Sequence, residues 1–284
     1  MDEGDGPAPI IILGAARSGT RFLRDVLAAA PACRAVPWDA NFLWRGPARW
    51  SDSDRIDPAR LDPRQRRALR RHLARLAGLG PGEVLVEKTV SNTLRVPLVA
   101  AVLPKARFVH LIRDGRAVSA SALGQWQAPQ DWSRLAAKLA RLPPAHLDYA
   151  LWQGLNLLAG RCFGCRGGRV WGPRYPGIAQ DLRRLPLAAV CARQWRHCLS
   201  HARQDLAHLP PAQVFELRYE TLITDPGAIE VLARGLGLDP APVLAAWRAA
   251  VQPRPSDHWS HLGPEDRAAI LAEAGPLLES LGYG

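Results

Sequence analysis

The sequence has few lysines, few cysteines and no long apolar run. Only three lysines occur among its 37 basic residues, so arginine supplies nearly all of the positive charge. No stretch reaches the roughly 18 uninterrupted apolar residues of a membrane-spanning helix. The acidic start Met1–Gly6 and the short apolar run after it do not match a secretory signal. Five cysteines, an odd number, do not suggest a disulfide framework. We therefore expect a soluble, cytoplasmic protein.

The charge of the chain is strongly positive, with a formal net charge of +11 and a pI near 10.3. Arginine suits planar anions such as phosphate and sulfate. The same bias also arises from composition alone, and several arginines between Arg64 and Arg71 lie on a predicted solvated helix face. A general nucleic-acid binder would interleave basic and aromatic residues along one surface, and no such run occurs. Weak, non-specific polyanion binding remains open on charge alone.

Alternating apolar runs and helical patterns predict an α/β fold, with a P-loop-like parallel β-sheet flanked by helices in a single domain. Buried strands are expected at Pro9–Gly14, Val84–Glu87, Arg107–Ile112 and Val214–Tyr219. Helices are expected at Thr20–Ala30, Pro63–Ala77, Asn92–Leu103 with Asn92 as N-cap, Asp114–Leu123, Asp131–Gly160 and Leu187–Leu209, with three short helices after the last strand. Residues 33–60 and 161–177 are expected to be irregular.

The first candidate site is the turn between the first strand and the first helix, which reads GAARSGTRF from Gly14 to Phe22. The spacing of Gly14 and Gly19 is typical of a loop that cradles phosphate with backbone N–H groups. It is not a Walker A motif, because Thr20 stands in place of the lysine and Arg21 in place of the Mg²⁺-binding hydroxyl. Arg17 supplies a cation instead. An ordinary structural turn between a strand and a helix is the alternative.

The second candidate site follows the strand Arg107–Ile112. Arg113 stands at the carboxyl end of a predicted parallel strand, where open α/β sheets bind ligands. Ser121 lies about two helical turns further on, so the guanidinium and the hydroxyl can converge on one phosphate. The alternative is a surface turn in which Asp114 merely caps the helix.

With both segments in this order, the sequence resembles the sulfotransferase family, in which an RSGT-type loop and a later RDGRxxxxS segment bind the donor. Further matching segments are Glu87–Asn92, Trp171–Gly177, Gln194-Trp195 and Leu217–Pro226. The resemblance is strongest to bacterial members and to the tyrosylprotein and carbohydrate branches. It implies a disordered N-terminus over residues 1–8 and a sulfotransferase domain over residues 9–284. The implied activity is sulfuryl transfer from 3′-phosphoadenosine 5′-phosphosulfate to an acceptor hydroxyl, without a metal.

The resemblance also implies residue roles. The residues expected to hold the 5′-phosphosulfate are Arg17, Ser18, Gly19, Thr20 and Arg21, although members usually have a second threonine where Arg21 stands. Arg113 and Ser121 match the pair that holds the 3′-phosphate, and Tyr219 matches an aromatic residue that contacts the nucleotide. A late loop normally adds contacts to the 3′-phosphate, and we assign it to residues 256–262.

Three residues are the catalytic candidates. Lys88 matches a family lysine that stabilises the leaving oxygen, with Arg17 as its helper. Asp39 is the candidate base, although a gap-free alignment puts Trp38 at the acidic position of the tyrosylprotein branch. The phenol and steroid branch uses a histidine; His110 lies inside a predicted core strand, while His258 and His261 lie in a predicted loop and stay as alternatives.

Other features leave the function open. Zinc-like residues occur at Cys162, Cys165, Cys191, His197, Cys198 and His201, although their spacing follows no compact zinc motif. Three tryptophans, Trp38, Trp44 and Trp50, either line an acceptor pocket or pack under a long loop. Competing functions are an atypical P-loop kinase or NTPase, a non-catalytic member that binds nucleotide or polyanion, and a nucleic-acid-binding protein. The acceptor and the oligomeric state cannot be inferred from the sequence.

Overall fold

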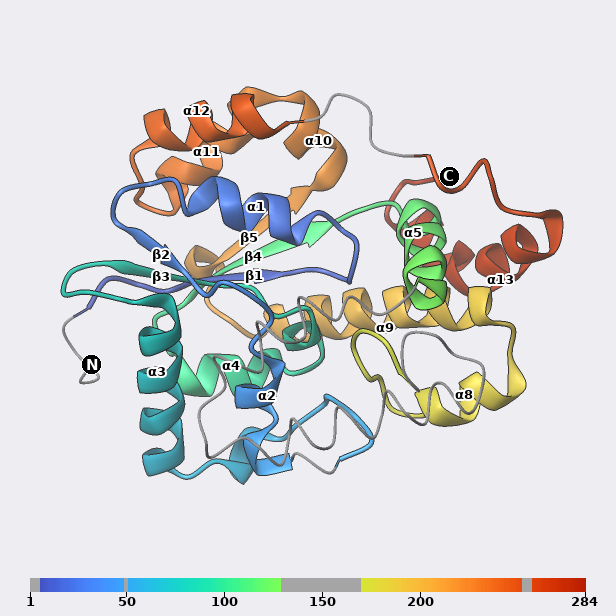
Figure 1. The fold of residues 1–284 in the computed structure, drawn as a ribbon, viewed down its shortest axis with the longest axis horizontal. Helices are drawn as coiled ribbons and strands as arrows, with labels where there is room; N and C mark the ends of the chain where they lie inside the picture. The colour runs from blue at the N-terminus through green and yellow to red at the C-terminus, as the bar shows by residue number, and fades with distance from the viewer. Residues whose placement is uncertain (1–5, 49–50, 129–169, 252–256) are drawn as a thin grey trace.

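Five parallel strands form the central sheet, in the order β2-β3-β1-β4-β5. The computed structural model describes residues 6–48, 51–128, 170–251 and 257–284. The strands are β1 Ile10–Leu13, β2 Cys33–Ala35, β3 Val84–Glu87, β4 Arg107–Ile112 and β5 Val214–Arg218. Helices lie on both faces of this sheet (Figure 1). The prediction of one α/β domain with a parallel, helix-flanked sheet is confirmed.

The central strand β1 feeds two separate hydrophobic cores. Ile10 and Ile12 pack on one face of the sheet, Ile11 and Leu13 on the other, and all four are fully buried. Burying each such side chain stabilises the fold by about 1.5–3 kcal/mol. This alternation places every β1 side chain inside, as expected for a strand with helices on both sides.

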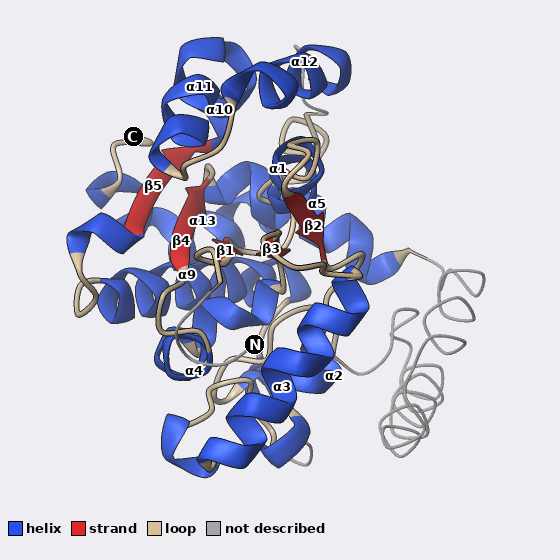
Figure 2. Cartoon of the chain, turned by 90° about the vertical axis from the view of Figure 1, so that its left-hand side faces the viewer, coloured by secondary structure: helices blue, strands red, loops and turns tan. Residues whose placement is uncertain are grey.

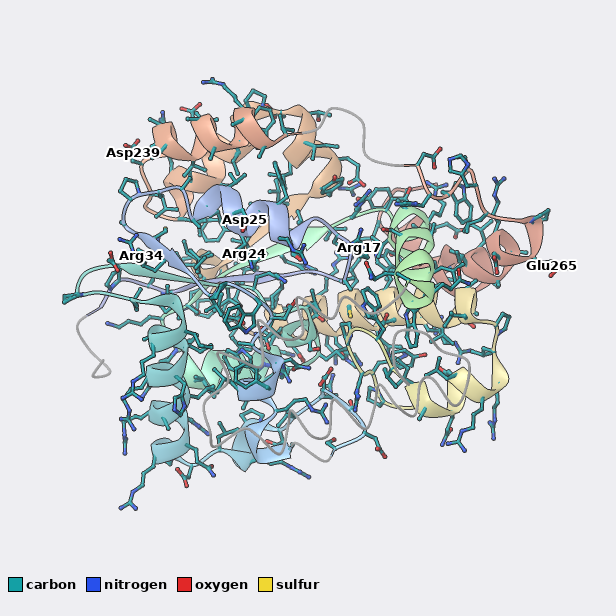
Figure 3. All side chains as sticks on the ribbon, in the orientation of Figure 1. Arg17, Arg24, Asp25, Arg34, Asp239 and Glu265 are labelled. Carbon is teal, nitrogen blue, oxygen red and sulfur yellow. The ribbon has the colours of Figure 1, made fainter. Side chains whose placement is uncertain are left out.

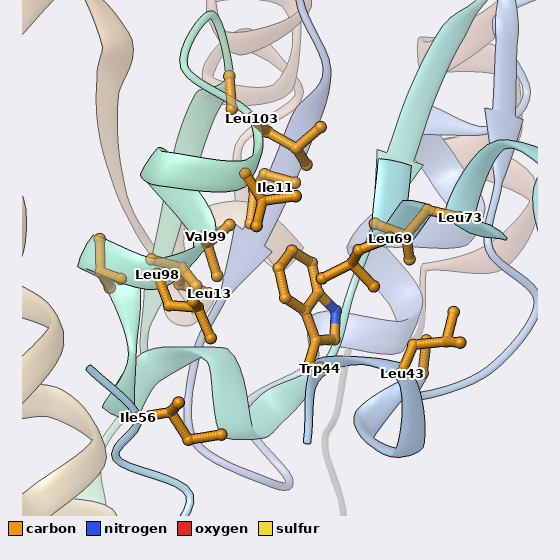
Figure 4. Packing of buried hydrophobic residues seen from close by; sticks show 14 of the residues in the cluster. Ile11, Leu13, Leu43, Trp44, Ile56, Leu69, Leu73, Leu98, Val99 and Leu103 are labelled. Carbon is orange, nitrogen blue, oxygen red and sulfur yellow. The ribbon is translucent and has the colours of Figure 1, made fainter. Parts of the chain in front are cut away.

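Different helices cover the two faces (Figure 2). The first face is covered by α1 Thr20–Leu27, α11 Pro226–Gly235 and α12 Pro240–Ala250. The second face is covered by α2 Asn41–Trp44, α3 Pro63–Ala77 and α4 Val96–Val102. On that face the Trp44 indole lies among Ile11, Val99 and Leu69 (Figure 4). Trp44 is therefore a packing residue; Trp38 is half-buried and Trp50 lies outside the described residues.

A third core lies beside the sheet. It is formed by α5 Gly115–Gln127, α9 Leu187–Leu206 and α13 Pro264–Ser280, which pack against one another. The shorter helices α8 Ile178–Arg184 and α10 Tyr219–Thr224 complete the described elements together with short 3₁₀ turns. This arrangement fixes α5, the helix that bears Ser121, against the carboxyl edge of the sheet.

Three predictions about local structure were wrong. Residues 33–60, expected to be irregular, contain the edge strand β2, which is too short to show an apolar pattern, and the short helix α2. The expected helix from Asn92 is divided into a 3₁₀ turn, Val90–Leu94, and α4. Asn92 is not its N-cap, because its side chain binds Glu87 and Arg95. The described residues after β5 form four helices, not three, and α13 has 17 residues.

Two further expectations concern the segment of residues 131–177 and membrane-spanning helices. The predicted helix Asp131–Gly160 lies outside the described residues, as does most of the predicted loop 161–177. Among the helices that are described, none combines the length and the apolar character needed to cross a membrane.

Candidate functional site

The turn from β1 to α1 has an unusual backbone. Arg17 has φ 74°, in the left-handed region that side chains with a Cβ rarely adopt, and Gly19 has φ 90°. A strained non-glycine residue costs about 1–3 kcal/mol and is typical of functional turns. Inside the turn, Ser18 is fully buried, and its hydroxyl has no hydrogen-bond partner among the described residues. The turn therefore holds a polar group in a position that a ligand can satisfy.

Arg113 lies beside this turn, at the carboxyl end of β4. Its Nη1 donates to the Arg17 carbonyl oxygen at 2.9 Å. Its guanidinium lies 4.0 Å from the centre of the Tyr219 ring, a distance typical of a cation–π contact. The Trp195 indole donates to the Arg113 carbonyl oxygen at 3.1 Å. Arg113 is thus held by the first turn, by α9 and by the start of α10.

A side-chain hydrogen bond joins the two predicted phosphate-binding segments. Arg17 Nε donates to Ser121 Oγ at 3.0 Å, and Figure 3 shows Arg17 beside α5. Burial lowers the pKa of Arg17, and the positive charges of Arg21 and Arg113 lower it further. No ion pair to a carboxylate is found for these three arginines within the described part of the chain. The site therefore concentrates positive charge that an anionic ligand would neutralise.

Lys88 and Asp39 form an ion pair at the end of the neighbouring strand. Lys88 Nζ lies 2.9 Å from Asp39 Oδ2, and Lys88 is buried. Asp39 Oδ1 accepts a second hydrogen bond from the Val90 backbone N–H at 3.0 Å. The two residues that the sequence proposed as cation and base are therefore in direct contact, although Asp39 was placed there only by a one-residue shift.

The sheet order explains why the predicted residues gather. Lys88 follows β3, Arg17 follows β1, Arg113 follows β4 and Tyr219 follows β5, and these four strands are consecutive neighbours in the sheet. Carboxyl ends of parallel strands meet at one edge. Thr20 is buried, and Arg21 is exposed at the first turn of α1. Each of the two outer contacts, Lys88–Asp39 and Arg113–Tyr219, thus flanks the central Arg17 turn.

The histidine alternatives differ in their surroundings. His110 is fully buried within β4, with Nδ1 3.6 Å from Glu216 Oε2, so its interpretation as a core histidine is confirmed. His258 and His261 are exposed. Ser256, the start of the loop assigned to the 3′-phosphate, lies outside the described residues, and that assignment stays a prediction.

The suggested zinc cluster is only partly visible. Cys162 and Cys165 lie outside the described residues, while burial raises the pKa of the Cys191 and Cys198 thiols to about 12. The His197 ring stacks on Tyr175 at 4.4 Å. In the described ranges no three histidine, cysteine or acidic residues are grouped as metal ligands. Cys191 and Cys198 are buried in the core formed by α5, α9 and α13.

Sequence reasoning missed one buried acid at the site. Glu87 immediately precedes Lys88 and is fully buried, with hydrogen bonds from Trp44, Thr89 and Asn92. The available signal was a carboxylate ending a wholly apolar strand, VLVE. Such an end residue usually faces solvent, so the pattern alone did not give it a role.

Comparisons with known proteins agree with this arrangement. The sequence profile of the Sulfotransferase family matches residues 9–164. The sulfotransferase domain of a Synechococcus olefin synthase is 15% identical, with 100% of this chain and 98% of that chain covered and a TM-score of 0.50. A Mycobacterium avium sulfotransferase is 14% identical, with 96% and 76% covered and a TM-score of 0.52. An Alicyclobacillus acidocaldarius sulfotransferase is 14% identical, with 95% and 92% covered and a TM-score of 0.50. At these identities the likeness shows the fold alone, and no curated protein sequence matches the chain significantly.

Proposed function

The chain belongs to the sulfotransferase family, and from this premise we propose that it transfers a sulfuryl group from 3′-phosphoadenosine 5′-phosphosulfate to an acceptor hydroxyl. The observation that most supports the proposal is the Arg17–Ser121 hydrogen bond, with Arg113 beside it. It brings a strained, glycine-containing turn and an arginine-serine pair into one positively charged site. A donor with two separate phosphate groups requires such a site.

The residues present fit this donor. Arg113 and Ser121 would hold the 3′-phosphate, because a planar guanidinium and a hydroxyl give directed hydrogen bonds to phosphate oxygens. The Tyr219 ring, already in contact with Arg113, would lie against the nucleotide. The turn Arg17–Arg21 would hold the 5′-phosphosulfate through the buried Ser18 hydroxyl, which has no partner among the described residues, and the first N–H groups of α1.

Transfer requires positioning and charge stabilisation more than covalent chemistry. Asp39 would accept the proton of the acceptor hydroxyl, and Lys88 would stabilise the negative charge that develops on the leaving bridging oxygen. In the described structure Lys88 is bound to Asp39. Lys88 would turn from Asp39 toward the leaving phosphate, and Asp39 would then be free to accept the proton of the acceptor. Arg17 would assist Lys88 from the adjacent strand end.

A labelled-donor transfer screen tests this function. The acceptors are an oligosaccharide, a lipid headgroup, a tyrosine peptide and a small alcohol, and the variants are Arg17→Ala, Lys88→Ala and Asp39→Asn. Wild type should label at least one acceptor class, and each variant should lose roughly 10²-fold or more in rate. Lys105→Ala, which changes an exposed lysine, should keep wild-type transfer. No transfer by wild type to any acceptor class would contradict the proposal.

A kinase or NTPase is the alternative that the loop spacing leaves. The position of the Walker lysine is occupied by Thr20, whose side chain is buried. Binding of Mg²⁺-ATP without binding of adenosine 3′,5′-bisphosphate would support that alternative. The proposed function requires the opposite result.

A further inference from the structure

Glu87 is a buried carboxylate that the proposed mechanism does not use. It is the last residue of β3 and is fully buried. Its Oε1 accepts hydrogen bonds from Thr89 Oγ1 at 2.5 Å and from Trp44 Nε1 at 3.2 Å, and its Oε2 accepts one from Asn92 Nδ2 at 2.9 Å. Burying an ionisable group is costly unless it is well bonded, so this arrangement calls for a role.

The Thr89 hydroxyl transmits the effect of Glu87. A hydroxyl has one proton to donate and lone pairs to accept with. Because Thr89 donates that proton to Glu87, its lone pairs are available to the Ala40 backbone N–H, which lies 2.9 Å from Oγ1. Ala40 directly follows Asp39. Glu87 therefore sets the polarity of a contact that holds the backbone next to the candidate base.

Three hydrogen bonds hold the Asp39–Ala40 segment against the end of β3. Besides the Ala40 contact, Asp39 accepts from Val90 N–H and from Lys88 Nζ. All three partners come from residues 88–90, immediately after Glu87. The segment itself follows β2, a three-residue edge strand that alone gives it little support.

We propose that Glu87, acting through the Thr89 hydroxyl, is a positioning residue that keeps Asp39 in reach of Lys88; its catalytic meaning rests on the proposed function. Neither Glu87 nor Thr89 touches the proposed donor or acceptor in this role. Their effect is on the geometry of the pair that does.

The neighbours of residue 87 require both of its side-chain oxygens to act as hydrogen-bond acceptors. Trp44 can only donate. Asn92 is fixed by Arg95, whose Nε donates to Asn92 Oδ1 at 2.8 Å, so the Asn92 amide N–H group faces Glu87. Burial raises the pKa of Glu87, and the hydrogen bonds from Thr89 and Trp44 oppose this shift. Since its partners act as donors, the ionised form matches the observed contacts.

Glu87→Gln is nearly isosteric yet cannot reproduce these contacts. Its amide nitrogen would face either Asn92, which also presents a donor, or Trp44 and Thr89. In the second case Thr89 must turn its proton away from residue 87, which reorients the hydroxyl that accepts from the Ala40 N–H. The substitution therefore changes the hydrogen-bond directions around Thr89 with little change in side-chain volume.

The test uses Thr89→Val, Glu87→Gln, the conservative Thr89→Ser, and Thr221→Val as a matched change at an exposed threonine. The first readout is brief acetylation of lysines, quantified by peptide mass spectrometry. Only three lysines are present, and exposed Lys105 is the internal reference. Loosening Asp39 exposes Lys88 to reagent, so the Lys88/Lys105 ratio should rise at least about threefold in Thr89→Val and Glu87→Gln. It should stay at the wild-type value in Thr89→Ser and Thr221→Val.

The second readout separates positioning from a general structural effect. In Thr89→Val the kcat for transfer should fall at least about tenfold, while Thr89→Ser restores it and adenosine 3′,5′-bisphosphate binding changes less than about twofold. An unchanged labelling ratio in both Thr89→Val and Glu87→Gln overturns the proposal, as does a parallel loss of bisphosphate binding. If wild type transfers to no acceptor, the proposed function fails, while the labelling ratios still decide whether Glu87 positions the pair.

Discussion

Arg17 Nε donates a hydrogen bond of 3.0 Å to Ser121 Oγ, across 104 residues of sequence. One residue lies in the turn after β1, and the other lies in α5, after β4. The contact therefore joins the two segments proposed to hold opposite ends of the donor. Since Arg113 also donates to the Arg17 carbonyl oxygen, the second segment supports the strained conformation of the first.

Removing either side chain of this contact should weaken nucleotide binding to different extents. Ser121→Ala removes one neutral hydrogen bond and should weaken adenosine 3′,5′-bisphosphate binding by about 0.5–1.5 kcal/mol. Arg17→Ala removes a charged donor and should weaken bisphosphate binding by about 1.5–3 kcal/mol. Calorimetric titration measures both. Arg183→Ala is the control and should bind as wild type does, because this exposed arginine donates to the Ala179 carbonyl oxygen of its own helix. Equal affinities for Ser121→Ala and wild type would show that the hydroxyl does not reach the ligand.

Arg113 should not be replaceable by lysine. Its planar guanidinium lies over the Tyr219 ring and at the same time donates to the Arg17 carbonyl oxygen, and a lysine ammonium has no planar face for the ring contact. Arg113→Ala should therefore reduce bisphosphate affinity at least about tenfold, and Arg113→Lys should recover only a small part of the loss.

Substitutions of Tyr219 complete this test. Tyr219→Phe keeps the ring under Arg113 and should bind almost as wild type does. Tyr219→Ala should lose bisphosphate affinity, although less than Arg113→Ala does. Full recovery by Arg113→Lys in equilibrium binding would mean that charge alone, without stacking or directed hydrogen bonds, holds the nucleotide.

Gly19 should not tolerate a methyl group. A Cβ at this position would lie 2.5 Å from two atoms of the Tyr219 ring, and the backbone φ of 90° is strained for alanine. Gly19→Ala should displace Tyr219, and with it Arg113, so bisphosphate binding should fall at least about tenfold.

The matched control for this change is Gly124→Ala. A Cβ on Gly124, within α5, meets no atom of the described residues inside 4 Å. It should keep full binding and raise the melting temperature slightly, because alanine favours a helix over glycine by about 1 kcal/mol. Should Gly19→Ala bind as well as Gly124→Ala does, the close approach of Tyr219 to the turn is not required for binding.

Much of the fold could be predicted because the central strands are apolar and rich in β-branched residues. The apolar runs at Ile10–Leu13 and Arg107–Ile112 are typical of buried strands in a parallel sheet. Since parallel strands end at one edge, the residues after them, Arg17 and Arg113, lie together. The edge strand Cys33–Ala35 was missed, because three residues are too few to show a periodicity.

The side-chain contacts of the site were beyond prediction. The Arg17–Ser121 bond depends on how far α5 approaches the first turn, and α9 and α13 determine that position through packing. The role of Glu87 depends on the burial of a strand-end carboxylate by Trp44, a residue from a segment expected to be irregular. Such contacts arise from tertiary packing, which local sequence patterns do not encode.

Acidification should destabilise the protein through His197. Burial, His201 and Arg196 lower the pKa of His197 from its usual 6.5 to about 4, while Asp181 opposes the shift. Below pH 6.5 the unfolded chain binds a proton that the folded chain excludes. The contribution of neutral His197 is therefore complete above pH 6.5 and is lost as the pH falls toward 4. Because solvent screens a half-buried ring, we expect this loss in the free energy of unfolding to be about 1–2 kcal/mol.

Other groups titrate nearby, so the effect must be measured as a difference. The raised pKa of Glu87 acts in the opposite direction, whereas the lowered pKa of Asp54 acts mainly at lower pH. His197→Phe removes the titrating group and keeps a ring on Tyr175. In urea unfolding at about pH 7 and about pH 4.5, its free energy of unfolding relative to wild type should improve by about 1–2 kcal/mol at the lower pH. His208→Phe, the same change at an exposed histidine, should show no such gain. A pH-independent difference for His197→Phe would mean that His197 takes up its proton equally in the folded and unfolded chain.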